Sequence, residues 1–506
     1  GMSEEILINV TPMETRVALI ENGLLQEIII ERHSHRGHVG NIYMGKVARV
    51  MPGMEAAFVD IGLDKAAFIH ASDISPIGAD GYENRDEHPH LIQALLREGQ
   101  MLVVQVSKDA ISTKGARLTT HLTLPSRHLV YLPRSKHIGV SQRLEDEDER
   151  ERLQLLLQQQ LQQQLEQLEA TGQSGQEEED LPGGFIIRTA AEGAGADEFK
   201  EDIQFLKRLW PKIQRRVNSS SGVGSVHRDV PLYMRTVRDL ITPKVERIRV
   251  DNQQSFQEIS QFLQDFVPEL STSVELYEGD RPILDLYSIE DEINKALGRQ
   301  VKLKSGGDLI IDQTEAMTTI DVNTGAYLGS RNHAETVLKT NLEAATAIAR
   351  QLRIRNLGGI IILDFIDMLD PEHQRQVQRT LAKALAKDHS RTAIYDMSAL
   401  GLIEMTRQRT RESLGQILNS HCPACDGRGT QKSAETVCYE IFREILSLAR
   451  TYENDVLLVM ASQLVVDRLL DEESKALATL EELVGKTVKF EVEPMYTQEQ
   501  FDVVLY

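Results

Sequence analysis

The chain has 506 residues, 41% of them hydrophobic and 26% charged, which predicts several ordinary globular domains, each with its own core. No apolar run approaches the roughly 20 residues of a membrane helix and no signal-peptide pattern opens the chain, so we expect a cytoplasmic protein without a membrane span. The formal net charge of −21 argues against a protein that holds nucleic acid by its overall charge, although a binding groove requires only local positive charge.

The first expected element is a β-hairpin over residues 5–31. Two apolar runs flank Asn22-Gly23, and this dipeptide is a strong signal for a tight turn. A lone hairpin is too small to be stable in water. We therefore expect it to join a sheet that is completed later in the chain.

From residue 39 the pattern changes to short strands separated by glycine, over residues 40–50, 56–62, 65–70 and 101–106. Closely spaced short strands favour a small barrel, and a five-stranded oligonucleotide-binding barrel fits this length. Phe58 and Phe68, with Tyr43, Lys46 and Lys114 around them, are candidates for a platform on which RNA bases stack beside phosphate-binding charge. The alternative is that both phenylalanines belong to the barrel core, which periodicity alone favours.

Residues 153–182 carry leucines at helical spacing among glutamines, followed by a break at 171–175 and an acidic run. We interpret this stretch as a surface insertion, a Gln-rich helix with a flexible acidic end. A coiled-coil contact is an alternative that the pattern does not require.

Beyond the insertion, Arg188 and Thr189 end an apolar strand. Guanidinium donors match phosphate oxygens in pairs, so these two residues are candidates for a phosphate grip, although most Arg-Thr pairs are simply exposed.

Residues 309–368 read as a strand, a long helix over about 334–353 and a second apolar strand. Such a crossover makes the two strands parallel, and their ends then meet at one edge of the sheet. Asp321 and Asp364 each follow an apolar run, and Asn323 lies beside the first. Paired carboxylates with a nearby amide suit Mg²⁺, which takes oxygen ligands and can activate water beside a phosphate. The alternative, that both aspartates only form turns or caps, is equally favoured by spacing alone.

The chain has three cysteines, two of them in Cys422-Pro423-Ala424-Cys425. Such a knuckle turns two thiolates toward one tetrahedral metal, normally Zn²⁺, and a structural zinc needs four ligands. Two copies of the chain can supply Cys422 and Cys425 each. His421 is a minor alternative ligand, and Cys438 lies on an amphipathic helix that predicts a buried position. Residues 433–506 alternate helix and strand in a small domain without a catalytic cluster, which suggests a dimer or tetramer contact.

Several motifs, in order, resemble the bacterial ribonuclease E/G family across nearly the whole chain. They are Gly40-Asn41-Ile42-Tyr43-Met44-Gly45, Ala56-Ala57-Phe58-Val59-Asp60-Ile61-Gly62, residues 113–120, residues 140–143, residues 184–190 and the stretch 309–368. The resemblance implies an α/β multidomain fold: an S1 (OB-type) β-barrel inserted in a ribonuclease-H-like subdomain, then a deoxyribonuclease-I-like α/β catalytic subdomain, a zinc knuckle and a small α/β domain.

The resemblance also implies domain boundaries. The ribonuclease-H-like subdomain would comprise residues 1–38 and 233–298, with a strand at 247–250 beside the N-terminal hairpin and without that fold's usual activity. The S1 RNA-binding barrel would comprise 39–124, the 5′-phosphate sensor region with the insertion 125–232, the catalytic subdomain 299–417, the zinc knuckle 418–430 and the small C-terminal domain 431–506.

The function implied by the resemblance is a Mg²⁺-dependent endoribonuclease that cuts single-stranded RNA, favours 5′-monophosphorylated substrates, and acts in ribosomal RNA processing and messenger RNA decay. The chain would form a homodimer through a shared structural Zn²⁺, with a tetramer as a further option. The family's motif positions correspond here to Asp321 and Asp364 as Mg²⁺ ligands with Asn323 beside them, Phe58, Phe68 and Lys114 as RNA-binding residues, and Arg188, Thr189, Arg143 and Val130 as the 5′-phosphate sensor.

Some positions depart from that pattern or lie beside it. Ser126 stands where some relatives have glycine, and Asp367 follows Asp364 without matching the family's metal position. Further candidate phosphate contacts, each with a solvated surface charge as its alternative, are Lys304, Arg391, Arg407 and Arg409.

Three rival functions remain at the level of sequence. One is a non-catalytic RNA-binding protein whose metal is structural, and another is a zinc-linked assembly scaffold. The third, a nucleotide-dependent enzyme, is disfavoured because the chain has no GxxxxGK[ST] phosphate loop.

Overall fold

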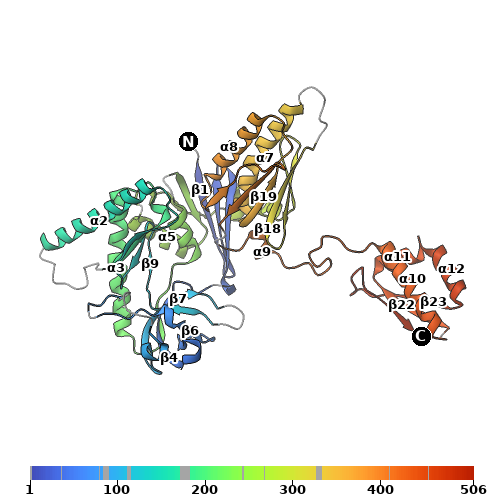
Figure 1. Ribbon diagram of the computed structural model, residues 1–506, viewed down its shortest axis with the longest axis horizontal. Helices are drawn as coiled ribbons and strands as arrows, with labels where there is room; N and C mark the ends of the chain where they lie inside the picture. The colour runs from blue at the N-terminus through green and yellow to red at the C-terminus, as the bar shows by residue number, and fades with distance from the viewer. Residues whose placement is uncertain are drawn as a thin grey trace. The chain divides into compact units, whose positions relative to one another are not determined.

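The computed structural model describes residues 3–35, 37–78, 80–83, 90–110, 115–170, 183–241, 244–266, 268–325, 333–408, 411–453 and 455–506. These residues form two compact units, Gly1–Leu414 and Gly415–Tyr506, the second coloured red in Figure 1. In the part of the chain that is described, every helix is too short or too polar to cross a lipid bilayer.

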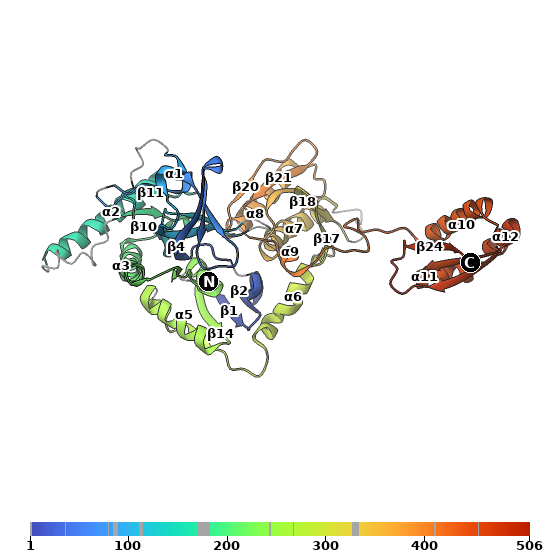
Figure 2. The ribbon, with the colours of Figure 1, turned by 90° about the horizontal axis from the view of Figure 1, so that it is seen from below.

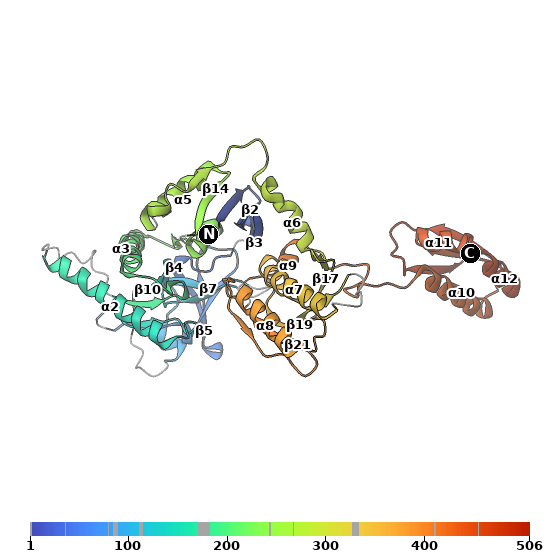
Figure 3. The ribbon, with the colours of Figure 1, turned by 90° about the horizontal axis from the view of Figure 1, so that it is seen from above.

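A five-stranded sheet receives the N-terminal hairpin, in the order β15-β14-β1-β2-β3. Its strands are β1 (Glu4–Val10), β2 (Glu14–Glu21), β3 (Leu24–Arg32), β14 (Val245–Val250) and β15 (Val274–Leu276). Asn22 and Gly23 adopt positive φ in the β2–β3 turn, as the hairpin prediction requires. β14 runs parallel to β1, with Ile6 opposite Ile248, so the expected later strand completes this sheet. Its helices are α4 (Leu232–Leu240), α5 (Gln253–Phe266) and α6 (Ile289–Ala296), and Figures 2 and 3 show α5 beside β14.

A closed barrel of five strands follows the hairpin, and it confirms the barrel prediction. It comprises β4 (Ile42–Met51), β5 (Ala56–Asp60), β6 (Ala67–His70), β7 (Met101–Lys108) and β8 (Arg117–Thr119). The β4–β7 pairing closes the ring, and β13 (Gly224–His227) pairs with β4 from outside it. Alternate residues point inward, so the barrel core contains Val47, Val59, Ile69, Val104 and Leu118.

The next region is a four-stranded sheet in the order β11-β12-β10-β9, covered by two long helices. The strands are β9 (Leu124–Pro125), β10 (Leu129–Leu132), β11 (Ile138–Val140) and β12 (Gly184–Ile187), and the helices are α2 (Glu147–Ala170) and α3 (Ala196–Ser219). Ile42 of the barrel belongs to the core of this sheet. The barrel and this region therefore share buried side chains.

The expected surface insertion is wrong for the first turns of α2. Leu153 and Leu157 are fully buried in the core against α3, because helical spacing places both on one face. Leu155 and Leu165 are exposed. The first half of the Gln-rich helix is thus part of the domain core, and its acidic end, residues 171–182, lies outside the described residues.

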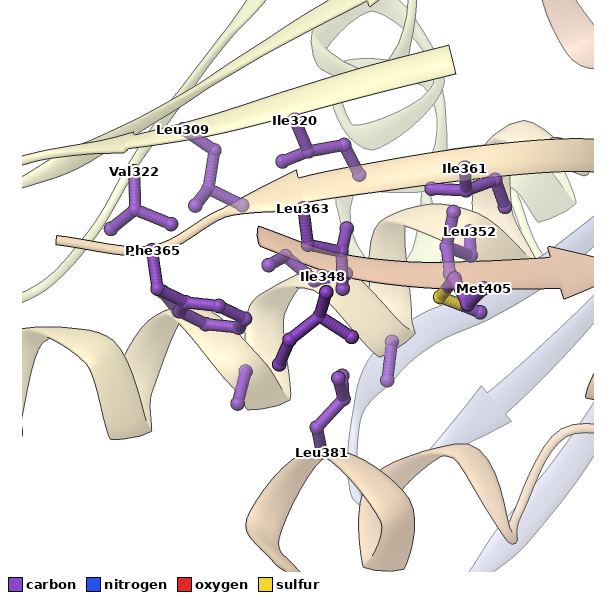
Figure 4. Packing of buried hydrophobic residues seen from close by; sticks show 14 of the residues in the cluster. Leu309, Ile320, Val322, Ile348, Leu352, Ile361, Leu363, Phe365, Leu381 and Met405 are labelled. Atoms are coloured by element: carbon purple, nitrogen blue, oxygen red, sulfur yellow. The ribbon is translucent and has the colours of Figure 1, made fainter. Parts of the chain in front are cut away.

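The stretch 309–368 lies in a six-stranded sheet ordered β16-β17-β18-β19-β21-β20. Its elements are β16 (Gln300–Lys302), β17 (Asp308–Gln313), β18 (Met317–Asn323), α7 (His333–Arg355), β19 (Gly359–Asp364), α8 (Pro371–Leu385), β20 (Thr392–Ile394) and β21 (Leu402–Arg407). β18 and β19 are parallel, which confirms the predicted crossover. Figure 4 shows Ile320, Val322 and Leu363 pointing from the strands toward Ile348 and Leu381 of the helices. One face of the sheet is therefore buried by α7 and α8.

The second unit contains a three-stranded sheet ordered β23-β22-β24. Its elements are α10 (Ala434–Thr451), β22 (Val456–Ala461), α11 (Gln463–Leu470), α12 (Ser474–Val484), β23 (Thr487–Val492) and β24 (Phe501–Leu505), with α9 (Leu414–Leu418) at the unit boundary. The predicted helices and strands here are confirmed, and α12 was not predicted. The remaining short helices are α1 (Ile92–Leu95) and the 3₁₀ turns His33–His35, Pro52–Met54, Ala71–Asp73, Thr189–Ala191, Pro268–Leu270 and Ile283–Ser288.

Candidate active site

Two carboxylates meet at the carboxyl end of the parallel pair β18 and β19. Asp321 and Asp364 are direct partners in the strand register, so their Cα atoms lie about 4.8 Å apart on one face of the sheet. Ile320, Val322 and Leu363, which flank them, point into the core. Strict alternation therefore turns both aspartates to the opposite face, away from α7 and α8.

The two aspartates influence each other electrostatically. The pKa of the Asp364 carboxyl is raised, first by partial burial and then by the negative charge of Asp321 and a hydrogen bond with it. The charge of Asp367, three residues further on, acts in the same direction. Like charges held this close favour protonation or a bound cation. The residues therefore fit a divalent metal ion.

The donor set is small, which bears on the kind of cation. In the described residues, Asp321 and Asp364 belong to no cluster of three or more His, Cys, Asp or Glu side chains that would enclose a metal. Asn323, two residues after Asp321 on the same face, is exposed and lies opposite Asp308 of β17. Two carboxylates and a neutral amide leave several positions for water, a pattern typical of Mg²⁺.

Two neighbouring residues escaped the sequence argument. Asn341 of α7 is completely buried, and its side-chain Nδ2 donates to Ile366 O at 2.9 Å while its Oδ1 accepts from Ile366 N at 3.1 Å. This pair of bonds holds the segment that follows Asp364 against the helix. Arg299 forms a bidentate ion pair with Asp312, at 2.6 and 3.0 Å, and also interacts electrostatically with Asp321. Neither an asparagine in mid-helix nor an arginine before β16 carries a sequence signal for such a role.

The further phosphate candidates are dispersed. Arg407 is wrong as a surface contact, because its side chain is buried and holds Asp388 at 2.8 and 3.1 Å, as well as Asn356 Oδ1 and Leu357 O. Arg391 forms an ion pair with Glu145, Lys304 is exposed, and Arg409 lies outside the described residues.

The barrel carries a row of aromatic and basic residues across neighbouring strands. Arg49 of β4 lies opposite Phe58 of β5, Phe58 opposite Phe68 of β6, and Phe68 beside Arg117 of β8. Both phenylalanines are half-buried, whereas Ala57, Val59, Ala67 and Ile69 around them point into the core. The two rings therefore lie on the outer surface rather than in the barrel core.

The charges beside this row differ from the expectation in part. Arg49 is exposed, and Arg117 is held by Asp73 at 2.9 and 3.1 Å. Tyr43, expected nearby, is buried in the core, and Lys46 is exposed opposite Asp60. Lys114 lies outside the described residues.

The four expected sensor residues lie around β10, β11 and β12. Arg188, after β12, donates from Nη1 to Ser126 O at 2.6 Å and to Asp239 Oδ1 at 3.1 Å. Thr189 Oγ1 lies 3.3 Å from Ser141 Oγ, which also accepts from Arg143 N at 3.3 Å. Ser141 thus links Thr189 to Arg143. The fourth residue, Val130, lies opposite Ile186 on the neighbouring strand.

Ser126, the departure from glycine, turns away from this surface. Its hydroxyl is buried and donates to Asp202 Oδ2 at 2.8 Å or to Leu129 O at 2.9 Å, while its backbone carbonyl accepts from Arg188. Asp202 also accepts from His128 N at 2.6 Å and Leu129 N at 3.2 Å. The serine side chain therefore braces the loop from within, and its backbone N–H and carbonyl are bonded to Leu129 O and Arg188.

The loop that carries Cys422 and Cys425 lies in the second unit. Asp426 N donates to Cys422 O at 3.0 Å and Arg428 N to Cys425 O at 2.9 Å, which curls the chain around the two sulfurs. The pKa of the Cys425 thiol is lowered by the N–H of Gly429, by Cys422 and by the N–H of Gly427, all of which favour a thiolate. His421 Nε2 lies 2.6 Å from Asp426 Oδ1. Cys438 is buried, as predicted, and burial raises the pKa of its thiol to about 11.

The chain matches three family models in sequence. The ribonuclease E/G family model covers residues 123–410, the S1 RNA-binding domain model residues 38–106, and the "RNase E/G, Thioredoxin-like domain" model residues 421–505. The chain is 52% identical to ribonuclease G of Escherichia coli (strain K12) over the full length of both. It is 50% identical to ribonuclease G of Haemophilus influenzae over 99% of both, and 35% identical to E. coli ribonuclease E over 94% of this chain and 44% of that protein. The chain belongs to the ribonuclease E/G family.

Proposed function

We propose that this endoribonuclease cleaves single-stranded RNA at the exposed sheet edge where Asp321 and Asp364 stand side by side. The observation that carries the proposal is their direct pairing in the β18–β19 register, on the face turned away from the core. Burial and the charge of Asp321 raise the pKa of Asp364, which indicates that the two carboxylates lack sufficient positive charge around them. A divalent cation relieves that deficit, and we assign Mg²⁺ from the oxygen-only donor set.

Each residue of this edge has a role in the proposed reaction. When bound, Mg²⁺ supplies a Lewis acid and a water of lowered pKa. Asp321 and Asp364 would hold the ion beside the scissile phosphate, and Asn323 would orient that phosphate through its amide. Asn341 keeps the segment after Asp364 in place. Water adds to phosphorus as the 3′-oxygen leaves, which yields a 5′-phosphate and a 3′-hydroxyl.

The substrate is held elsewhere on the chain. In the row Arg49, Phe58, Phe68 and Arg117, two neighbouring rings are flanked by an arginine on each side, a combination that suits unpaired bases and their phosphates. We also propose Lys114 as an RNA-binding residue, as the resemblance implies. Because aromatic rings stack on any unpaired base, this surface should bind single-stranded RNA with little dependence on its sequence.

We assign Arg188, Thr189, Arg143 and Val130 to a pocket for the 5′-monophosphate. The link through Ser141, which joins Thr189 to Arg143, supports this assignment. A terminal phosphate carries more charge than an internal one, and guanidinium groups bind it in pairs. Substrates with this end are thereby favoured.

We propose the domain boundaries stated above as the division of labour among sensing, clamping and cleavage. Cys422 and Cys425 are proposed to share one Zn²⁺ with the same pair of a second chain, forming a homodimer, with a tetramer as a further option. Cytoplasmic ribosomal RNA processing and messenger RNA decay are the proposed settings. A chelator should split the dimer, and Cys425→Ser should do the same, whereas Cys438→Ala should leave it intact in sedimentation.

The test uses one fluorescent oligoribonucleotide with either a 5′-monophosphate or a 5′-hydroxyl, each with and without Mg²⁺. Cleavage is expected only with Mg²⁺ and faster with the monophosphate. If RNA is bound but never cut, the chain is an RNA-binding protein with a structural metal. Equal rates for the two 5′ ends would refute the sensor assignment and leave the catalytic one standing.

A further inference from the structure

A cavity of about 350 Å³ lies between the barrel and the four-stranded sheet, away from the acid pair and the expected sensor residues. Its lining includes Val103 of β7, Tyr82, Arg134, and Trp210 and Gln214 of α3. Figure 1 and Figure 2 both show α3 beside the barrel. Because the two regions share the buried core that contains Ile42, the walls of this cavity are held together by packing. Its volume is in the range that accepts small ligands.

The walls combine aromatic surface with positive charge. Trp210, the single tryptophan of the chain, packs edge-on against Tyr131 with ring centroids 6.4 Å apart and is half-buried. Tyr82 lies under Lys136, whose Nζ is 4.7 Å from the ring centroid. Asp80, which also lines the cavity, has its charge balanced by Lys136 at 2.8 Å. Such rings suit a flat ligand that stacks.

Arg134 points to an anion. It is partly exposed, and burial lowers the pKa of its guanidinium. The charge that favours its protonated form is that of Glu83, whose carboxylate is already 3.0 Å from His121 Nδ1. An anionic ligand in the cavity can pair with this guanidinium.

The wall formed by α3 adds positive charge along the approach. Five of the ten residues from 207 to 216 are lysine or arginine and none is acidic, although the whole chain has a net charge of −21. Trp210 and Gln214, one helical turn apart, both line the cavity within this basic run. Local positive potential of this kind attracts phosphates.

We propose that this cavity is a nucleotide-binding subsite, in which a base packs against Trp210 and Tyr82 and its phosphate pairs with Arg134. The chemistry is that of one nucleoside monophosphate unit, supplied either by the RNA chain or by a free mononucleotide. The proposal is separate from the active site, and it draws only on the RNA-binding part of the proposed function. It predicts that RNA contacts the protein at a third place besides the barrel row and the 5′-phosphate pocket.

The single tryptophan provides a direct test. The full chain carrying Asp364→Asn, which keeps RNA uncut, is titrated with a 5′-hydroxyl oligoribonucleotide, with adenosine monophosphate and with inorganic phosphate, while Trp210 fluorescence is recorded. Saturable quenching by the oligonucleotide alone assigns the site to RNA, and saturable quenching by the mononucleotide assigns it to free nucleotides. Absence of saturable quenching by both, or quenching by phosphate alone, would overturn the proposal.

Charge variants locate the binding. Gln214→Glu places a carboxylate in the cavity and should weaken binding about tenfold, because a like charge beside the phosphate repels it. Gln204→Glu makes the same change on an exposed part of α3 outside the lining and should leave the affinity within twofold. Arg134→Gln removes the positive charge from the lining and should match Gln214→Glu. Equal affinities for all three variants would place the bound RNA elsewhere than in this cavity.

Discussion

Asn341 offers the sharpest test of how the site is held, because it touches no substrate. Its amide makes two hydrogen bonds to the backbone of Ile366, at 2.9 and 3.1 Å, inside a fully buried setting. Asn341→Ala removes both. Each bond contributes about 1 kcal/mol net, so the loss is about 2 kcal/mol, and it falls on the segment that begins two residues after Asp364.

The kinetic consequence should be larger than the loss of stability. A displacement of about 1 Å in catalytic groups can lower the rate roughly 100-fold. We therefore expect kcat of Asn341→Ala to fall about 10- to 100-fold, because the carboxylates no longer hold their relative position. Oligonucleotide affinity should stay within twofold, since Asn341 bonds to the backbone of Ile366 and belongs to no strand of the barrel. Single-turnover cleavage and fluorescence anisotropy on the same samples separate the two quantities.

A matched control comes from the opposite end of β19. Asn356 is also buried, and its amide contacts Arg411 O, Glu412 O and Arg407. Its φ is 49°, so Asn356→Gly removes the amide without strain in the left-handed region. This variant should lose similar stability and keep kcat. If Asn341→Ala cleaves at the normal rate, or if Asn356→Gly loses kcat equally, the positioning argument is refuted.

Three further predictions follow from other parts of the chain. Phe58→Ala and Phe68→Ala should each weaken binding of single-stranded RNA by about 5- to 100-fold, the range of one stacked base, while circular dichroism remains unchanged because both rings lie outside the barrel core. Arg407→Ala leaves Asp388 buried without its partner, so it should destabilise the first unit by about 3–5 kcal/mol in chemical denaturation, and a normal melting temperature would show that the pair is not buried in solution. Burial lowers the pKa of His227 below its usual 6.5, so between these two pKa values the unfolded chain takes up a proton that the folded chain does not. The contribution of His227 to stability is therefore fully present above pH 6.5 and is lost as the pH falls from 6.5 toward the lowered pKa. His227→Gln should be less sensitive to acid than the unaltered chain in melting experiments from about pH 7.5 to about pH 5.

The acid pair could be predicted because its signals are local. Apolar residues alternate on both sides of Asp321 and precede Asp364, and a crossover helix of this length leaves only a parallel pairing. The barrel followed from the spacing of short strands. Spacing alone could not decide between catalytic and turn-forming aspartates. The pairing of Asp321 with Asp364 on the open face of the sheet supports the catalytic role that we propose.

Other positions failed because the deciding contact is distant in sequence. Arg407 has the sequence signature of a surface charge, yet Asp388, 19 residues earlier, receives it in the core. Phe58 and Phe68 have apolar neighbours on both sides, so periodicity could not tell the inner from the outer face. Leu153 resembles Leu165 in pattern, and only the packing of α3 makes the first buried and the second exposed. Asn341 has no sequence signal, because its partner is the backbone of another element.

The central claim is that Asp321 and Asp364 act as one site. The most direct measurement compares cleavage by Asp321→Asn, Asp364→Asn and the double variant, with Glu315→Gln, an exposed carboxylate in the β17–β18 turn, as the control. Each single variant should lose cleavage as completely as the double one, while RNA affinity and the control's rate stay unchanged. Full cleavage by the double variant would contradict the account.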